Sequence, residues 1–99
     1  MSRQVSLSVN NVPIRLNDFV EEYLDGVVSG IVASLKDTGE IESLRLSIDN
    51  EGQVTINLNG SMVPLKYFPS EVIKSTILGM VSPLKGVGEV NRLEITIGG

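Results

Sequence analysis

The sequence lacks cysteine, histidine and tryptophan altogether. Without His and Cys, the chain has none of the usual ligands for zinc, copper or haem iron, and no residues for Ser-His, Cys-His or His general-base catalysis. The absence of Cys also excludes a disulfide framework and a thiol nucleophile. Only carboxylates, Lys, Tyr and hydroxyl groups remain for chemistry. A small carboxylate enzyme would need a cleft lined by several acids, and the sequence pattern gives no sign of one. We therefore expect no catalytic residue, no metal site, no cofactor and no enzyme activity.

Basic residues and long apolar runs are also scarce. Eight Lys and Arg stand against twelve Asp and Glu, and the net charge of −4 has the wrong sign for a surface that tracks nucleic-acid phosphates. No window approaches the roughly 20 apolar residues of a membrane-spanning helix. The first residues, Met1–Gln4, lack the apolar segment of a signal peptide. We therefore expect a cytoplasmic protein that binds neither nucleic acid nor membrane.

The chain is similar to itself at an offset of 49 residues. Residues 4–50 align with residues 53–99 without a gap, and fourteen of the 47 aligned pairs are identical. Apolar and polar positions also stay in phase. We interpret this similarity as a tandem duplication, which gives a single domain, residues 1–99, made of repeats 4–50 and 53–99. The alternative is a chance match between two similar strand-helix-strand units, but a chance match would be expected to need gaps.

Each repeat begins with a hairpin pattern. Apolar residues alternate with polar ones on both sides of Asn10-Asn11, and again on both sides of Asn59-Gly60, a pair typical of type I′ turns. Two-residue turns would place the apolar side chains of each hairpin on one face. The predicted cross-strand pairs are Val9 with Val12, Leu7 with Ile14, Val5 with Leu16, Leu58 with Ser61, Ile56 with Val63 and Val54 with Leu65.

A helix is predicted after each hairpin. In the first repeat, Asn17-Asp18 is typical of a helix N-cap, and Glu21, three residues after Asp18, completes a capping-box pattern. This helix is predicted over about residues 18–36. In the second repeat, Pro83 is expected to truncate or kink the helix, because its ring clashes with a carbonyl group one turn earlier.

Small residues follow one side of each predicted helix. Such a track allows another element to approach closely, and we expect it to contact the helix of the other repeat across a pseudo-two-fold axis. Contact with the sheet is the main alternative, and exposure to solvent is a further one. The track consists of Gly26, Gly30 and Ala33 in the first repeat and Ser75, Gly79 and Ser82 in the second.

Each predicted strand has one apolar face, so both helices should cover the same side of the sheet. The expected fold is an α/β (α+β) two-layer sandwich, in which two ββαβ repeats form a six-stranded mixed sheet with two helices on one face. Pro13 and Pro64 favour the hairpins at the outside, with strands 41–48 and 90–97 in the middle. The sequence leaves the strand order open. A two-fold axis normal to the sheet fixes the directions of both hairpins, and these directions can be satisfied only if a helix crosses the sheet diagonally.

The uncovered face of this sheet is predicted to carry small polar residues and a few charges. The four aromatic residues fall at the predicted helix starts, so the face has no aromatic platform for RNA bases. It is either a solvated face or a flat surface for protein association. If it binds a partner, the contact residues we expect are Arg15, Arg45, Arg92 and Glu94.

Two further motifs have structural explanations. An acidic group at the first helix start suits the helix dipole better than a cation site, because its spacing is not that of a metal-binding loop. This group contains Asp18, Glu21, Glu22 and Asp25. The segment 86–89, Gly-Val-Gly-Glu, follows a helix instead of preceding one, so it predicts a turn and not a phosphate-binding loop.

The sequence ends in Gly98-Gly99, directly after a predicted strand. A ββαβ order ending in Gly-Gly resembles the ubiquitin-like β-grasp proteins and their bacterial sulfur-carrier members, in which a terminal glycine carboxylate is adenylated and thiocarboxylated. The resemblance implies a carrier role for these two glycines. The chain differs from that group in its two copies of the unit, in the missing spacer before the glycines, and in Asp49-Asn50 at the corresponding place of the first copy. Simple termination of the strand is the alternative.

These observations predict a non-catalytic protein-binding or scaffold module whose partner is another protein or a second copy of the chain. Its single-repeat ancestor would have assembled as a homodimer that the duplication then joined. A sulfur carrier that uses its C-terminal Gly-Gly is the alternative function.

Overall fold

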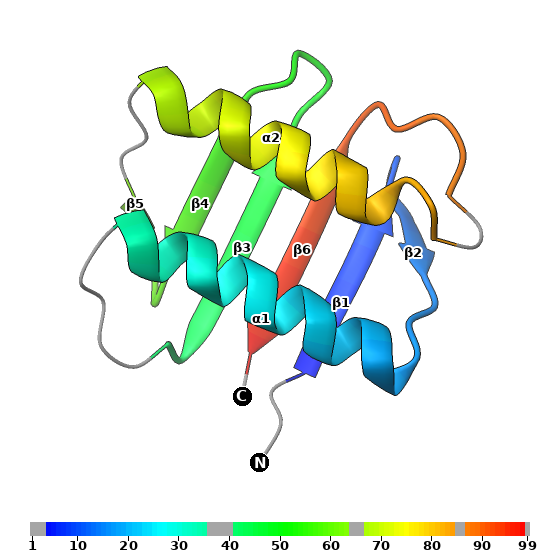
Figure 1. The fold of residues 1–99 in the computed structure, drawn as a ribbon, viewed down its shortest axis with the longest axis horizontal. Helices are drawn as coiled ribbons and strands as arrows, with labels where there is room; N and C mark the ends of the chain where they lie inside the picture. The colour runs from blue at the N-terminus through cyan, green and yellow to red at the C-terminus, as the bar shows by residue number, and fades with distance from the viewer. Residues whose placement is uncertain (1–3, 36–40, 64–66, 85–86, 99) are drawn as a thin grey trace.

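Two helices lie on one face of a six-stranded sheet (Figure 1). The computed structural model describes residues 4–35, 41–63, 67–84 and 87–98. The element order is ββαβ followed by a second ββαβ, and the fold is α+β, as predicted. The elements are β1 (Gln4–Val9), β2 (Val12–Ile14), α1 (Asp18–Leu35), β3 (Ser43–Ile48), β4 (Val54–Leu58), β5 (Ser61–Val63), α2 (Tyr67–Val81) and β6 (Leu93–Gly98).

The sheet is antiparallel at every neighbouring pair of strands, in the order β2-β1-β6-β3-β4-β5. The hairpins lie outside and the two remaining strands lie in the middle, as predicted. The prediction of a mixed sheet is wrong. Each helix crosses the strands diagonally (Figure 1), so β3 is not adjacent to β1 in the sheet. The position between β1 and β3 is filled by β6, which runs opposite to both strands.

Both hairpins have the predicted registers along β2 and β5. The predicted pair of Val5 with Leu16 is not formed, because β2 ends at Ile14, and Leu65 lies outside the described residues. The turn residues of both hairpins have positive φ at both central positions, as a type I′ turn requires. Those φ values are 54° at Asn10, 68° at Asn11, 50° at Asn59 and 85° at Gly60. The observed pairs are Leu7 with Ile14, Val9 with Val12, Ile56 with Val63 and Leu58 with Ser61.

The prolines limit the elements next to them. Pro13 lies in the edge strand β2 opposite Ser8, as predicted, where its missing N–H removes no ladder hydrogen bond. The helix α2 ends at Val81, two residues before Pro83, so the predicted truncation is confirmed. Pro64 lies outside the described residues.

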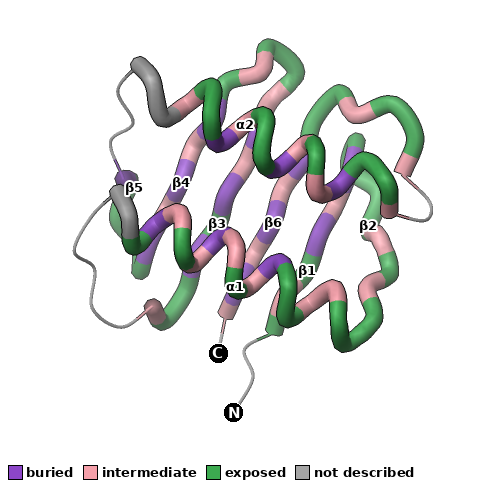
Figure 2. The backbone as a smooth tube through the Cα atoms, in the orientation of Figure 1, coloured by how far each residue is buried: buried purple, intermediate pink, exposed green. Residues whose placement is uncertain are grey.

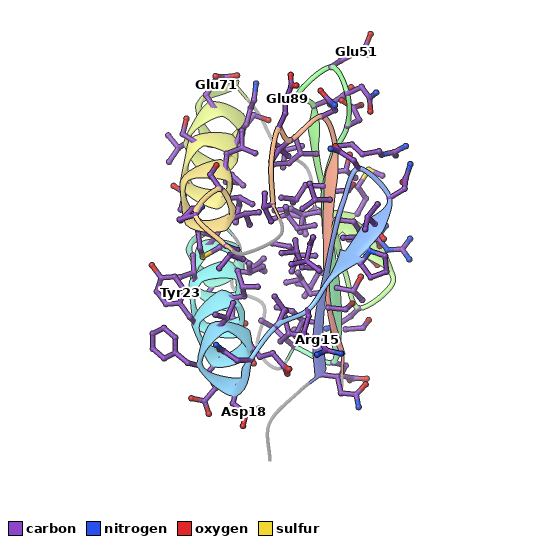
Figure 3. The ribbon with its side chains drawn as sticks, turned by 90° about the vertical axis from the view of Figure 1, so that its right-hand side faces the viewer. Arg15, Asp18, Tyr23, Glu51, Glu71 and Glu89 are labelled. Carbon is purple, nitrogen blue, oxygen red and sulfur yellow. The ribbon has the colours of Figure 1, made fainter. Side chains whose placement is uncertain are left out.

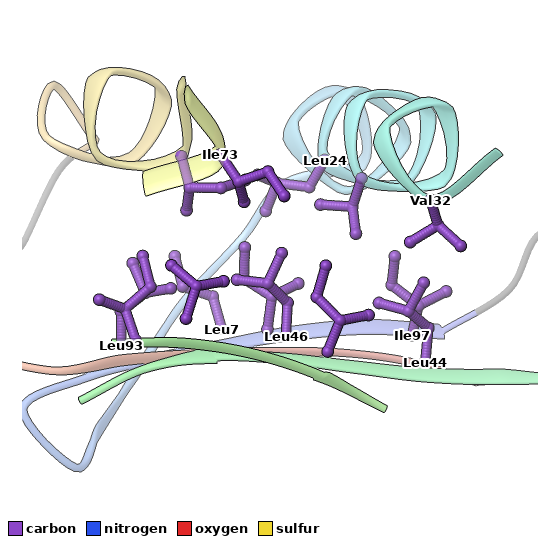
Figure 4. Packing of buried hydrophobic residues seen from close by; sticks show 14 of the residues in the cluster. Leu7, Leu24, Val32, Leu44, Leu46, Ile73, Leu93 and Ile97 are labelled. Carbon is purple, nitrogen blue, oxygen red and sulfur yellow. The ribbon is translucent and has the colours of Figure 1, made fainter. Parts of the chain in front are cut away.

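A single hydrophobic core fills the space between the helices and the sheet (Figure 4). Each helix contributes one stripe of residues four positions apart, which is the spacing of a helix face. All buried side chains are aliphatic, and none in the described part of the chain is polar or charged. The stripes are Leu24, Val28 and Val32 on α1 and Ile73, Ile77 and Val81 on α2; the strands add Leu7, Val9, Leu44, Leu46, Ile48, Val54, Ile56, Leu58, Val63, Leu93, Ile95 and Ile97.

Asn17, and not Asp18, caps α1. The Oδ1 atom of Asn17 accepts a hydrogen bond from the backbone N–H of Val20 at 2.8 Å, and its carbonyl oxygen accepts one from Glu21 at 3.0 Å. The third helical position is therefore Val20, and the predicted capping box between Asp18 and Glu21 is wrong. Both acids still lie in the first turn, where a carboxylate interacts favourably with the helix dipole.

The predicted close contact through the small-residue track is also wrong. All six track residues, from Gly26 to Ser82, are exposed, and the outer sides of both helices are open to solvent (Figure 2). A Cβ atom added at Gly26, Gly30 or Gly79 would meet nothing within 4 Å. The reason is angular: two residues turn a helix by about 200°, so Gly26 lies opposite the buried Leu24.

We expect Gly79→Ala to increase the free energy of unfolding by about 0.5–1 kcal/mol. The position is helical and open, so the added methyl group meets no neighbour and lowers the conformational entropy of the unfolded chain. Urea denaturation followed by circular dichroism measures the change. A decrease would mean that this side of α2 is in close contact with another element.

Gly52→Ala is the matched control, with the opposite sign. Gly52 has a φ of 81°, and a Cβ atom there would lie 2.6 Å from Nζ of Lys74. We expect this variant to lower the free energy of unfolding, because Ala is strained at positive φ.

Candidate functional site

The face of the sheet opposite the helices is uncovered (Figure 3). Side chains alternate along each strand, so the residues between the buried positions point to this open face. The cross-strand registers arrange them in rows. One row contains Pro13, Ser8, Glu94, Ser47 and Thr55, and the next contains Ser6, Thr96, Arg45, Asn57 and Met62. Hydroxyl and amide groups predominate, which makes the open sheet face flat and polar.

An ion pair joins the two central strands on this face. The Nε atom of Arg45 lies 3.5 Å from Oε2 of Glu94, and the two side chains are 62% and 42% exposed. An exposed pair of this kind contributes little to stability, typically about 0–1 kcal/mol. Both charges therefore remain accessible to a partner.

Arg15 and Arg92 lie away from this central pair. Arg15 follows the edge strand β2 and is exposed. Arg92 precedes β6, is exposed, and contributes to the lining of a depression beside the turn between β3 and β4. Of the four predicted contact residues, Arg45 and Glu94 are the two for which the described part of the structure has an ion pair.

The turn residue Asn10 ties the first hairpin to the segment that enters β6. Its Oδ1 atom accepts hydrogen bonds from the backbone N–H groups of Asn91 at 2.7 Å and Arg92 at 3.0 Å. Its Nδ2 atom donates to the carbonyl oxygen of Glu89 at 2.8 Å. Positive φ is tolerated by Asn, so one residue forms the turn and holds the neighbouring segment.

Asn59 has the corresponding role in the second hairpin. Its Oδ1 atom accepts hydrogen bonds from the N–H groups of Glu42 at 2.8 Å and Ser43 at 2.9 Å, where the chain enters β3. The sequence reasoning treated Asn10 and Asn59 as turn residues only and missed these contacts. The available signal was that both halves have Asn at this aligned position.

A shallow depression of about 210 Å³ lies at the end of the sheet near the turn between β3 and β4. The side chain of Lys74 packs over Gly52, while Oδ1 of Asp49 accepts hydrogen bonds from the backbone of Glu51 and Gln53, both at 2.9 Å. Two cations and two carboxylates are among the lining residues, so their charges balance and favour neither an anion nor a cation. The lining is Ile48, Asp49, Asn50, Glu51, Gly52, Lys74, Leu78, Val90, Asn91 and Arg92.

The other sequence motifs do not form a reaction centre in the described residues. The acids of α1 lie along its first turns, where Oδ1 of Asp25 accepts a hydrogen bond from Oγ of Ser29 at 2.9 Å. No group of three or more acidic side chains in the described ranges is arranged to hold a metal ion. Gly98 belongs to β6 and pairs with Gln4 and Ser43, whereas Gly99 lies outside the described residues.

Comparisons of the chain with protein-family models, curated proteins and solved structures gave no match. Neither helix in the described ranges combines the length and the apolar character that crossing a membrane requires.

We expect Asn10→Gly to lower the free energy of unfolding by about 1–3 kcal/mol, because it removes three exposed hydrogen bonds and a typical hydrogen bond contributes about 0.5–1.5 kcal/mol net. Gly accepts the φ of 54°, so turn strain does not contribute. Asn10→Asp keeps the Oδ1 acceptor, but its second carboxylate oxygen replaces the donor opposite the carbonyl oxygen of Glu89 and repels it. We still expect a smaller destabilisation in urea than for Asn10→Gly, because both Oδ1 contacts remain. A loss as large as that of Asn10→Gly would mean that the Oδ1 contacts do not outweigh this repulsion.

Proposed function

We propose that this chain is a non-catalytic protein-binding module and that a partner docks on the open sheet face around Arg45 and Glu94. The observation that supports this most directly is that both helices cover the same side of the sheet (Figure 3). The other side presents a flat array of short polar side chains, with two opposite charges at its centre. Such a surface accepts a flat partner without large rearrangement.

The composition supports a protein as the partner. The net charge of −4 disfavours nucleic acid, and a chain without Cys is consistent with the cytoplasm. The edges of the sheet are short strands of three residues, and Pro13 lies in one of them. Short edges with Pro resist the addition of a further strand, so the face is the more suitable docking surface.

We further propose that the module arose by tandem duplication, with a pseudo-two-fold axis between β3 and β6. Supporting features are the gapless self-alignment, the same element order in both halves, and the matching contacts of Asn10 and Asn59. Arg45 and Glu94 are aligned positions. In a dimer of single repeats, these two positions would have carried the same residue. Once the copies are joined in one chain, the two positions can carry opposite charges.

A double variant tests the binding surface. Arg45→Glu combined with Glu94→Arg preserves the net charge and the ion pair but reverses the charges that a partner meets. Pull-downs from host lysate with immobilised wild type and variant, followed by mass spectrometry, should show specific partners lost by the variant. The unfolding midpoint should be nearly unchanged.

Glu71→Gln, on the exposed side of α2, is the control and should retain the partners. If the double variant captures the same proteins in the same amounts as wild type, the partner does not bind around Arg45 and Glu94.

The sulfur-carrier alternative stays a prediction with its own test. A carrier needs a terminal glycine that enters an activating enzyme, and Gly98 is paired within the central strand β6. Intact-mass measurement of protein purified from its host would show the replacement of one terminal oxygen by sulfur if the alternative holds. We expect the unmodified mass.

A further inference from the structure

The outer side of α1 exposes the largest apolar side chains in the described part of the chain. Phe19 is 73% exposed and Tyr23 is 51% exposed, and their rings are stacked, with centroids 6.0 Å apart and an interplanar angle of 6°. Tyr23 points away from the sheet (Figure 3). Every buried side chain in the described part of the chain is aliphatic, so the core there forms without these two rings. Exposed aromatic residues are typical of the central contacts of protein interfaces.

Further along the helix, the same side of α1 carries small side chains. Gly26, Gly30 and Ala33 are exposed, and a Cβ atom at either glycine would meet nothing within 4 Å. The outer face of α1, defined by these three residues with Phe19 and Tyr23, therefore has large side chains in one half and small ones in the other. A surface of this shape is complementary to itself when one copy is reversed.

We propose that the outer face of α1 is a self-association surface on which a second copy of the chain docks with its α1 antiparallel. A two-fold axis near Gly26 would relate the copies. Phe19 and Ala33 each lie seven residues from Gly26, about 10 Å along the helix, so Phe19 of each copy would lie over Ala33 of the other. Tyr23 lies three residues from Gly26 and would lie over Ser29 of the other copy, so both rings meet small residues, as a two-fold interface between unequal halves requires.

Charge selects the antiparallel orientation. Asp18 and Glu22 are exposed on the first half of α1, whereas residues 26–35 contain no charged residue. An antiparallel pair places the acids of each copy opposite the uncharged half of the other. A parallel pair would place acids against acids, which is unfavourable at close range.

The size of the helix layer is sufficient for a dimer. The helix layer is one of the two broad sides of a molecule that measures 34 Å by 34 Å perpendicular to its shortest axis, and α1, with 18 residues, is about 27 Å long. A typical stable interface buries about 800 Å² per partner, so α2 of both copies would have to contribute beside the α1 pair. Val72 on α2 is 44% exposed and extends the apolar surface. This proposal does not depend on the open sheet face, which lies on the other side of the molecule.

Sedimentation equilibrium of the full chain from micromolar to millimolar concentration tests the dimer. We expect the wild type to reach twice the monomer mass, and Phe19→Lys to weaken the dimer by roughly tenfold or more. Gly26→Gln should also weaken it, while raising the stability of the monomer, because Gln favours the helix more than Gly. Met62→Lys is the matched control: Met62 is 66% exposed on β5, and its replacement should leave the dimer intact.

Cysteine cross-linking tests the orientation, since the chain has no Cys of its own. Residues 22 and 30 are equally far from Gly26, so a mixture of Glu22→Cys and Gly30→Cys proteins should form mixed disulfides faster than either protein alone. A monomer mass at every concentration would overturn the proposal. So would a dimer that survives both Phe19→Lys and Gly26→Gln, or one in which the two Cys variants cross-link only to themselves.

Discussion

The burial of one apolar face of the sheet under two helices is the constraint on which the structure depends. Leu24 on α1 and Ile77 on α2 belong to stripes that close this face, and both residues are fully buried. Burying an aliphatic side chain of this size contributes roughly 1.5–3 kcal/mol to the free energy of unfolding, so exposing this layer in either half would be strongly destabilising. The two halves cannot separate without exposing it, because β6 lies between β1 and β3.

This one-sided core leaves two different surfaces free. The open sheet face is flat and polar, with Arg45 and Glu94 at its centre. The outer face of α1 is uneven and largely apolar, with Phe19 and Tyr23 in one half. The chemistry of each surface favours a different contact: fixed charges and hydroxyl groups recognise a polar partner, whereas exposed rings gain most from burial. The two surfaces lie on opposite sides of the molecule, so the two contacts proposed above do not compete for the same residues.

The periodic features of the fold were predictable from the sequence. Alternation around two-residue turns predicted the pairing of Leu7 with Ile14 and of Ile56 with Val63, and both pairs are observed. Pro83 predicted the early end of α2 because the clash is local. The helix cap was wrong by one residue, since Asn17 and Asp18 are both good capping residues, and in the structure it is Oδ1 of Asn17 that accepts the hydrogen bond from Val20.

Features that depend on distant elements were harder to predict. The small residues of α1 were assigned to a close contact because of their type, although Gly26 lies about 200° around the helix from Leu24 and faces solvent. For the candidate site, Arg45 and Glu94 were predicted to share a face and do so. Arg92 lies instead in the segment before β6, where its backbone is held by Asn10, 82 positions away in the sequence.

The sequence by itself determined the hairpins, the helices and the side of each strand that is buried, because these follow from residue spacing within a single element. Tertiary structure decided the strand order, the antiparallel sheet and the contacts of the turn asparagines. Those depend on the diagonal path of each helix, which sets the place in the sheet where the next strand enters. The length of a helix can be predicted from its residues, but its direction across the sheet depends on how the whole core packs.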